Sequence, residues 1–256
     1  MDSIALDLGF IKIYWYSIFI LLGVITGVLI IIKEAKRKNL DEDFIINTLF
    51  FGILFAIIGA RLYYVLFNLD YYLNNPIEII EIWNGGLAIH GGIIAGLITI
   101  LFMCKKHKVN VIKLLDTIAL GLIIGQAIGR WGNFFNSEAY GSVVSLSSLK
   151  SIGIPSFIIN GMYIDEAYHH PTFFYESIWC LIGFIILFVN RKKFNLGNSL
   201  GFYLIWYGLG RFFIEILRTD SLMLGPLKVA QLISMVFVIV GIYFLFIYKK
   251  SGGKHE

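Results

Sequence analysis

Six ionisable side chains lie within apolar stretches of the chain, where a charged group is costly to keep. They are Arg61, His90, Arg130, Glu176, Arg211 and Glu215. Three of the six are arginines, whose planar guanidinium pairs with phosphate through two parallel hydrogen bonds and keeps its charge when partly desolvated. These residue types indicate a site for the headgroup of an anionic phospholipid, and they leave open whether the site also performs chemistry.

The spacing along the chain groups several of these residues. Tyr207, Arg211, Glu215 and Arg218 follow one another at intervals of 4, 4 and 3, which places them on one face of a helix. Arg211 and Glu215 can also form an ion pair with each other on that face, without any ligand.

Two further groups of polar residues border apolar stretches. The first runs from Arg130 through Asn133, Asn136, Glu138 and Tyr140, and the second contains His169, His170, Tyr175 and Glu176. The paired histidines suggest a metal, but no HExxH sequence, Cys/His quartet or carboxylate cluster accompanies them. The sequence therefore predicts neither a metal nor another cofactor.

The elements that carry these residues follow from the composition. Of the 256 residues, 58% are apolar and 15% are charged, and the mean hydropathy is +0.79. An ordinary soluble domain carries about 25% charged residues, so a soluble globular protein, a disordered chain and a disulfide scaffold are excluded. Charge-poor runs of membrane length predict an all-α protein with seven transmembrane helices, at about 13–32, 44–68, 84–104, 114–135, 171–190, 198–217 and 228–248.

The basic residues predict the orientation of these spans. Of the 21 lysines and arginines, 14 fall in alternate loops and the C-terminal tail, in segments 33–43, 105–113, 191–193 and 249–254. Cytoplasmic loops are rich in basic residues, which places the C-terminus in the cytoplasm and the N-terminus outside. All six intramembrane ionisable residues then lie in the outer half of the bilayer. Because the basic excess is mostly an orientation signal, no nucleic-acid partner is expected.

Two structural details are also predicted. Segment 137–170 is the longest stretch outside the spans and is expected to form a small, partly β extracytoplasmic head, with a type I′ hairpin turn at Asn160-Gly161. Gly121, Gly125 and Gly129 recur every four residues, which favours close helix packing.

The segment Gly129-Arg-Trp-Gly-Asn-Phe-Phe-Asn-Ser-Glu-Ala-Tyr-Gly141 resembles the signature of the prolipoprotein diacylglyceryl transferases, G-R-x-G-N-F-x-N-x-E-x-x-G, at every fixed position. Three more stretches are similar to motifs of that family: Gly85-Gly-Leu-Ala-Ile-His-Gly-Gly92, His170-Pro-Thr-Phe-Phe-Tyr-Glu176, and Tyr207-Gly-Leu-Gly-Arg-Phe-Phe-Ile-Glu-Ile-Leu-Arg-Thr-Asp220. Tyr16 stands where the family has a tyrosine in its first span. The resemblance covers nearly the whole chain, in order.

The resemblance implies a multi-pass enzyme of the bacterial cytoplasmic membrane. It would transfer the diacylglyceryl group of phosphatidylglycerol to the lipobox cysteine thiol of prolipoproteins and release glycerol phosphate, in the first step of lipoprotein maturation. Its partners would be phosphatidylglycerol, the prolipoprotein signal peptide and the bilayer. The expected catalytic residues are Arg130, Arg211, His90 and Tyr16. The expected phosphatidylglycerol-binding residues are Arg130, Asn133, Asn136, Glu138, Gly141, Arg61, Tyr207, Glu215 and Arg218, with His170, Tyr175 and Glu176 in secondary roles.

Three points stay open at the level of the sequence. His90 is the candidate base for the substrate thiol, but electrostatic activation by the arginines alone is an alternative. A lipid or anion transporter is the second functional hypothesis, although transporters place polar groups across the full bilayer depth. The third is another membrane transferase, acting on a different phospholipid or on undecaprenyl phosphate, which would require a divalent metal.

Overall fold

A computed structural model describes residues 3–9 and 12–248 of the chain. These residues divide into two compact units: the smaller comprises residues 32–114, and the larger comprises the remainder on either side. Seven helices among the described residues are long and apolar enough to cross a membrane. The predicted seven-helix fold is confirmed, and the chain is a multi-pass membrane protein.

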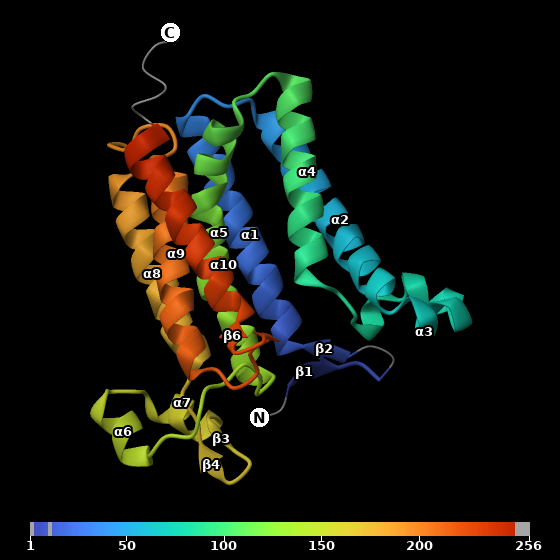
Figure 1. Ribbon diagram of the computed structural model, residues 1–256, viewed down its shortest axis with the longest axis vertical. Coiled ribbons are helices and arrows are strands. Elements are labelled where there is room, and N and C mark those ends of the chain that lie inside the picture. The colour runs from blue at the N-terminus through green and yellow to red at the C-terminus, as the bar shows by residue number, and fades with distance from the viewer. Residues whose placement is uncertain (1–2, 10–11, 249–256) are drawn as a thin grey trace. The chain divides into compact units, whose positions relative to one another are not determined.

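Five of the seven long helices lie side by side in the larger unit (Figure 1). The five are α1 (Trp15–Arg37), α5 (Val111–Phe135), α8 (Thr172–Asn190), α9 (Asn198–Leu217) and α10 (Val229–Ile242). The end of α1 and the start of α5 belong to the smaller unit. A π-helical turn, η3 (Tyr243–Ile247), extends α10.

Glycines let α1 and α5 approach to backbone contact. A Cβ atom on Gly23 would lie 2.8 Å from the carbonyl oxygen of Gly125, and one on Gly27 would lie 2.9 Å from that of Gly121. Such distances leave no room for a side chain, so small residues are required at this crossing. The predicted packing role of Gly121 and Gly125 is confirmed.

A pair of tryptophans joins α8 to α9. The indole nitrogen of Trp179 donates to the carbonyl of Trp206 at 2.7 Å, and that of Trp206 donates to the carbonyl of Trp179 at 2.8 Å. Their rings stack with centroids 4.4 Å apart. Residues of α5, α8 and α9, among them Leu120 and Cys180, form a shared buried core. These contacts bring the polar residues of the three helices together.

Asp116 of α5 caps the start of α9. Its carboxylate is 2% exposed and accepts hydrogen bonds from the backbone N–H groups of Gly197 and Leu200, each at 2.8 Å. The first N–H groups of a helix have no partner within it, so this carboxylate supplies one from a neighbouring helix.

Asp116→Ala is therefore expected to lower the free energy of unfolding by about 1–3 kcal/mol, the cost of leaving buried donors unpaired. The measurement is the thermal unfolding midpoint of the purified protein in detergent. Asn110→Ala is the matched control, because Asn110 caps the start of α5 at an exposed position and should cost less, about 0.5–1 kcal/mol. Equal midpoints for Asp116→Ala and the wild type would contradict the role of the cap.

The segment between α5 and α8 forms a small head. It contains α6 (Leu146–Ser151), α7 (Ser156–Gly161), β3 (Tyr163–Ile164) and β4 (Ala167–Tyr168). Its core packs Ile158 and Met162 of the head against Phe134 of α5 and Phe173 of α8.

The predicted hairpin turn at Asn160-Gly161 is wrong. These two residues end the helix α7, whose Ile158 and Ile159 are buried. The turn instead lies at Asp165 and Glu166, which both have positive φ, +49° and +63°, as a type I′ turn requires. Burial of consecutive apolar residues in the head core favours the helix over the alternation of a strand.

Two other hairpins border the long helices of the larger unit. The first pairs β1 (Ile4–Asp7) with β2 (Lys12–Tyr14) immediately before α1. The second pairs β5 (Met223–Leu224) with β6 (Leu227–Lys228) between α9 and α10.

The smaller unit is built on a closely packed helix pair, α2 (Glu42–Phe67) and α4 (Ile89–His107). A Cβ atom on Gly91 would lie 2.2 Å from the carbonyl oxygen of Gly59. The two helices are joined by α3 (Leu69–Asn74), η1 (Pro76–Ile80) and η2 (Ile82–Asn84). Helix α4 begins later than the predicted span at residue 84, because Gly85 and Gly86 adopt φ of +85° and +69° and interrupt the helix.

Candidate active site

A single buried carboxylate joins arginines from two helices of the larger unit. Glu176, in the first turns of α8, is 2% exposed. One of its oxygens, Oε1, lies 2.6 Å from Nη2 of Arg130 on α5. The other, Oε2, accepts a hydrogen bond from Nη1 of Arg211 on α9 at 3.2 Å. The sequence assigned Glu176 a secondary role, whereas the structure places it at the centre of the arginine cluster.

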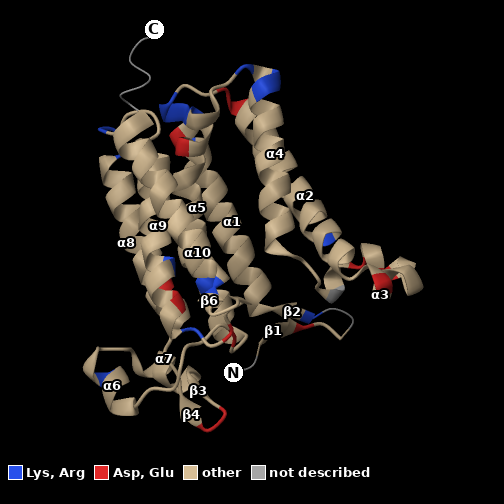
Figure 2. Ribbon diagram, in the orientation of Figure 1, with Lys and Arg blue, Asp and Glu red and all other residues tan. Residues whose placement is uncertain are grey.

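The network continues along the predicted face of α9. Nη2 of Arg211 lies 2.8 Å from Oε2 of Glu215, which is 1% exposed, and Nε of Arg218 lies 3.9 Å from the same oxygen. The ion pair within α9 that the spacing permits is therefore present, and Arg211 makes it while also binding Glu176. Figure 2 shows charged residues towards the ends of the long helices of this unit.

Arg218 also forms a bidentate ion pair with Asp220, the last residue of the network. Its Nε and Nη2 donate to the two carboxylate oxygens at 2.9 and 2.7 Å. Burial opposes ionisation of Asp220, but the hydrogen bonds from Arg218 outweigh it and hold the pKa of this carboxyl below its ordinary value. Asp220 is thus a carboxylate at neutral pH.

Lys228, the residue that precedes α10, binds the C-terminal end of α9. Its Nζ donates to the carbonyl oxygens of Glu215 at 2.6 Å and of Arg218 at 2.8 Å. The last carbonyls of a helix lack partners within it, and a lysine can supply one. Neither Lys228 nor Asp220 was among the predicted site residues. The sequence signal for Asp220 was its place at the end of the sixth-span motif, whereas Lys228 gave none.

The exit of α5 carries the polar residues of the predicted signature. Asn133 donates through Nδ2 to Oε1 of the exposed Glu138 at 2.8 Å, and the N–H of Asn136 bonds the carbonyl of Gly132 at 3.2 Å. Tyr16 of α1 packs on Gly132, where a Cβ atom would lie 2.9 Å from the tyrosine ring.

Two tyrosines lie near Arg130. The charges of Glu138 and Arg130 act on the hydroxyl of Tyr16, which is 37% exposed. Tyr207 of α9 stacks on Tyr203 with ring centroids 5.9 Å apart, and the charge of Arg130 also acts on it. The charge of Arg130 thus acts on both tyrosines, and the charge of Glu138 also acts on Tyr16.

Gly141 fastens the chain that leaves α5 to the start of α8 and the end of α9. Its N–H donates to the carbonyl of His170 at 2.9 Å, and the N–H of Ser142 donates to that of Leu217 at 2.8 Å. A Cβ atom on Gly141 would lie 2.8 Å from the Cβ of His170 and 3.1 Å from the carbonyl oxygen of Leu217. A glycine at this position therefore permits close contact with the protein's own chain at His170 and Leu217.

The two adjacent histidines have different surroundings. His169 is buried, with Nδ1 2.8 Å from the carbonyl oxygen of Gly141. His170 is half-buried, with Nδ1 3.2 Å from the hydroxyl of Tyr175. Among the described residues, no three His, Cys, Asp or Glu side chains are arranged to hold a metal ion.

His170 gives a pH dependence of known sign. Burial disfavours the imidazolium and lowers the pKa of His170 below its ordinary 6.5. Between the two values the unfolded chain binds more protons than the folded chain, so stability falls as the pH decreases through 6.5. We expect the unfolding midpoint in detergent to be lower at mildly acidic pH. This decrease should be smaller in His170→Asn, which lacks the titrating imidazole. An identical drop in the variant would contradict the assignment.

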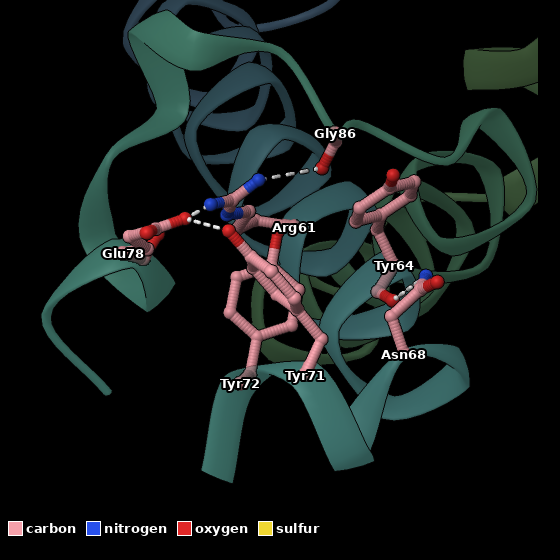
Figure 3. A pocket seen from close by; sticks show the side chains of 7 residues that line it. All are labelled: Arg61, Tyr64, Asn68, Tyr71, Tyr72, Glu78 and Gly86. Carbon is pink, nitrogen blue, oxygen red and sulfur yellow. Dashed lines mark hydrogen bonds between the residues drawn. The ribbon is translucent and has the colours of Figure 1, made fainter. Parts of the chain in front are cut away.

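Arg61 and His90 belong to the smaller unit. Arg61, 6% exposed, directs its guanidinium at backbone carbonyls of the segment that precedes α4. It lines a cavity of about 390 Å³ together with three tyrosines and Glu78. Figure 3 shows these side chains around the cavity. His90 lies in the first turn of α4, exposed, with its ring centroid 6.1 Å from that of Tyr63.

Comparison with known proteins relates the chain to one family over nearly its whole length. The family model described as prolipoprotein diacylglyceryl transferase matches residues 3–247. A phosphatidylglycerol–prolipoprotein diacylglyceryl transferase of Staphylococcus saprophyticus is 47% identical over 248 residues, which are 96% of this chain and 89% of the relative. A protein of the same name from Bacillus cytotoxicus is 45% identical over 253 residues, 98% of this chain and 94% of the relative.

Proposed function

Because the chain belongs to the prolipoprotein diacylglyceryl transferase family, we propose that it transfers diacylglycerol units from phosphatidylglycerol to prolipoproteins. The sulfur of the lipobox cysteine forms a C–S bond to the glyceryl carbon of the diacylglyceryl group while the bond from that carbon to the phosphate oxygen breaks. Glycerol phosphate leaves with the electron pair, and the thiol proton is lost. The product is a thioether, the first intermediate of bacterial lipoprotein maturation.

The observation that best supports this reaction is the contact of Arg130 and Arg211 with one carboxylate, that of Glu176. In phosphatidylglycerol the phosphate carries one negative charge, and the departing glycerol phosphate gains a second. Fixed cations aimed at that oxygen stabilise the transition state more than the bound lipid, which is the condition for catalysis. We therefore assign phosphate binding and leaving-group stabilisation to these two arginines.

In this proposal Glu176 occupies the position of the incoming phosphate before substrate arrives. It keeps two guanidinium groups from adjacent helices close together, although their like charges repel one another. When the lipid phosphate enters, its oxygens take up the N–H groups that leave Glu176, and Glu215 continues to hold Arg211. In this proposal the site is thereby preorganised by its own side chains.

The other polar residues have supporting roles in this proposal. Asn133 and Glu138 hold each other and orient the headgroup, with Asn136 beside them, whereas Tyr16 donates a hydrogen bond to the bound lipid. Tyr207 packs beside Arg130, Arg218 extends the cationic face, and Gly141, His170 and Tyr175 maintain the backbone that carries the site.

Removal of the thiol proton is assigned to His90. A free cysteine thiol has a pKa of about 8.5, and its thiolate is the reactive form. Histidine is the side chain used most often as a general base near neutral pH. The alternative is that the arginines alone stabilise the thiolate, and in that case His90→Gln would leave the pH–rate profile unchanged.

We further propose that the enzyme lies in the bacterial plasma membrane with its N-terminus outside and the head on the extracytoplasmic side. The basic residues of alternate loops support that orientation. The site would then face the leaflet where prolipoproteins emerge after export.

The deciding experiment uses purified protein, phosphatidylglycerol vesicles and a synthetic lipobox peptide. Mass spectrometry is expected to detect a diacylglyceryl thioether peptide and released glycerol phosphate, both with and without a chelator. Loss of product in chelator would favour the metal-dependent transferase. Movement of lipid across the bilayer without any turnover would favour a transporter.

A further inference from the structure

Arg61 is a buried cation whose contacts differ from those of the arginines in the larger unit. It is 6% exposed, and its hydrogen bonds reach backbone carbonyls: Nε to Ile79 at 2.9 Å, Nη1 to Gly85 at 2.8 Å and to Gly86 at 3.1 Å, and Nη2 to Glu78. Four of the five N–H donors of the guanidinium are thus committed within the protein. An arginine bound in this way has little capacity left for a lipid phosphate.

These carbonyls belong to the segment that leads directly into α4. Figure 3 shows Arg61 between Glu78 and Gly86, so that one side chain holds both ends of residues 78–86. The guanidinium carbon also lies 5.2 Å from the ring centroid of Tyr72, which adds a cation–π contact. Gly86 has a φ of +69°, and a Cβ atom there would lie 2.4 Å from Nη1 of Arg61. The segment is therefore shaped around the guanidinium.

Three residues separate Gly86 from His90. Within that interval the N–H of Ala88 bonds the carbonyl of Ala60 at 3.0 Å, so the start of α4 is fixed beside the residue that precedes Arg61. A Cβ atom on Gly91 would lie 2.4 Å from the Cβ of Tyr63. The glycine contact sets the separation of α4 from α2, and the Arg61 contacts set where the first turn of α4 begins.

We propose that Arg61 is a positioning residue for His90, not a ligand of the lipid. It keeps the segment before α4 closed, so that His90 occupies one position at the start of the helix. This inference replaces the phosphate-binding role expected for Arg61 from its residue type. The expected effect of Arg61 on catalysis rests on the proposed function, in which His90 removes the thiol proton.

The first test reads the surroundings of His90 directly. In detergent-solubilised protein with isotope-labelled histidines, the His90 resonance is identified by its absence in His90→Gln. Arg61→Met is expected to shift or split that resonance and to leave those of His169 and His170 in place. Tyr71→Phe is the matched control, because Tyr71 lines the same cavity but its hydroxyl bonds the side-chain carboxylate of Glu78 and not Arg61. Phenylalanine keeps the ring that packs on Tyr72, so the variant should leave the resonance unchanged.

The second test asks whether Arg61 acts through His90 in lipidation of the peptide. Arg61→Met is expected to lower kcat by about 10²-fold, the scale of a small misplacement of a reacting group, with a smaller change in KM for phosphatidylglycerol. In the His90→Gln background the same substitution should lower kcat less than twofold, since residues acting as a unit are not additive.

An unshifted His90 resonance in a folded Arg61→Met variant would overturn the proposal, and so would an equal loss of kcat in both backgrounds. If Arg61→Met does not fold, Gly86→Ala displaces the guanidinium while keeping its charge, and the same two results are expected of it. Failure of the wild type to lipidate the peptide would overturn the proposed function instead, and the resonance test would still decide the role of Arg61.

Discussion

Arg130→Ala is expected to reduce thioether formation to a small residual rate while leaving a folded protein. The guanidinium lies 2.6 Å from the carboxylate that also binds Arg211, and in the proposed reaction both arginines stabilise the departing phosphate. Removing one preorganised donor from such a site lowers kcat by about 10²–10³-fold. Arg130→Lys should recover only a small part of that loss, because an ammonium cannot make two parallel hydrogen bonds to phosphate.

The measurement is the initial rate of peptide lipidation by mass detection, with folding checked by size-exclusion chromatography and thermal unfolding. Arg191→Ala is the control, since this arginine follows α8 at the end away from Glu176 and stacks on Phe188. It should retain wild-type turnover. Undiminished turnover in a folded Arg130→Ala variant would overturn the assignment of Arg130.

Substitutions of Glu176 are expected to separate stability from substrate binding. Glu176→Ala removes the buried carboxylate that two partly buried guanidinium groups share, and removing one partner of a buried ion pair costs about 3–5 kcal/mol. The reason is desolvation: the guanidinium groups lose their shared counter-charge where little water can replace it, although Arg211 keeps its contact with Glu215. We expect a large fall in the unfolding midpoint, accompanied by loss of activity.

Glu176→Gln should keep the shape of the site and remove the negative charge. The lipid phosphate then meets no competing carboxylate, so KM for phosphatidylglycerol should fall. The arginines are held less firmly, so kcat should fall as well. A decrease in both parameters distinguishes this carboxylate from a merely structural residue, whereas an increase in KM with unchanged kcat would contradict the proposed exchange of ligands at the arginines.

The sequence predicts the helices of this protein well because lipid imposes a simple rule. A span must be long, apolar and hydrogen-bonded within itself, and runs such as 198–217 satisfy that rule without reference to their neighbours. The head is different, because its backbone is shaped by contacts between distant segments. Asn160-Gly161 has the composition of a tight turn, yet burial of Ile158 and Ile159 places it at the end of a helix.

The sequence indicates the residue types of the candidate site, but it does not indicate which of those residues are in contact. Four-residue spacing identified the face that carries Arg211 and Glu215, because one helix fixes the geometry of such a pair. The contact between Glu176 and Arg130 joins residues 46 positions apart along the chain, and no local pattern predicts it. Arg61 shows the same limit: its residue type indicates a phosphate ligand, but its partners are carbonyls that folding brings to it.

The ion pairs that extend from Glu176 form a network whose charges add up to zero. It joins three arginines to three carboxylates, namely Arg130, Arg211 and Arg218 with Glu176, Glu215 and Asp220. A neutral cluster exerts little long-range pull on anionic lipids, because opposite charges at short range cancel at a distance. The site would therefore attract anionic lipids weakly at long range and exchange one bound anion for another at contact. It would discriminate by whether an arriving phosphate can displace a carboxylate at contact, so that selection occurs at the moment of binding and not during the approach.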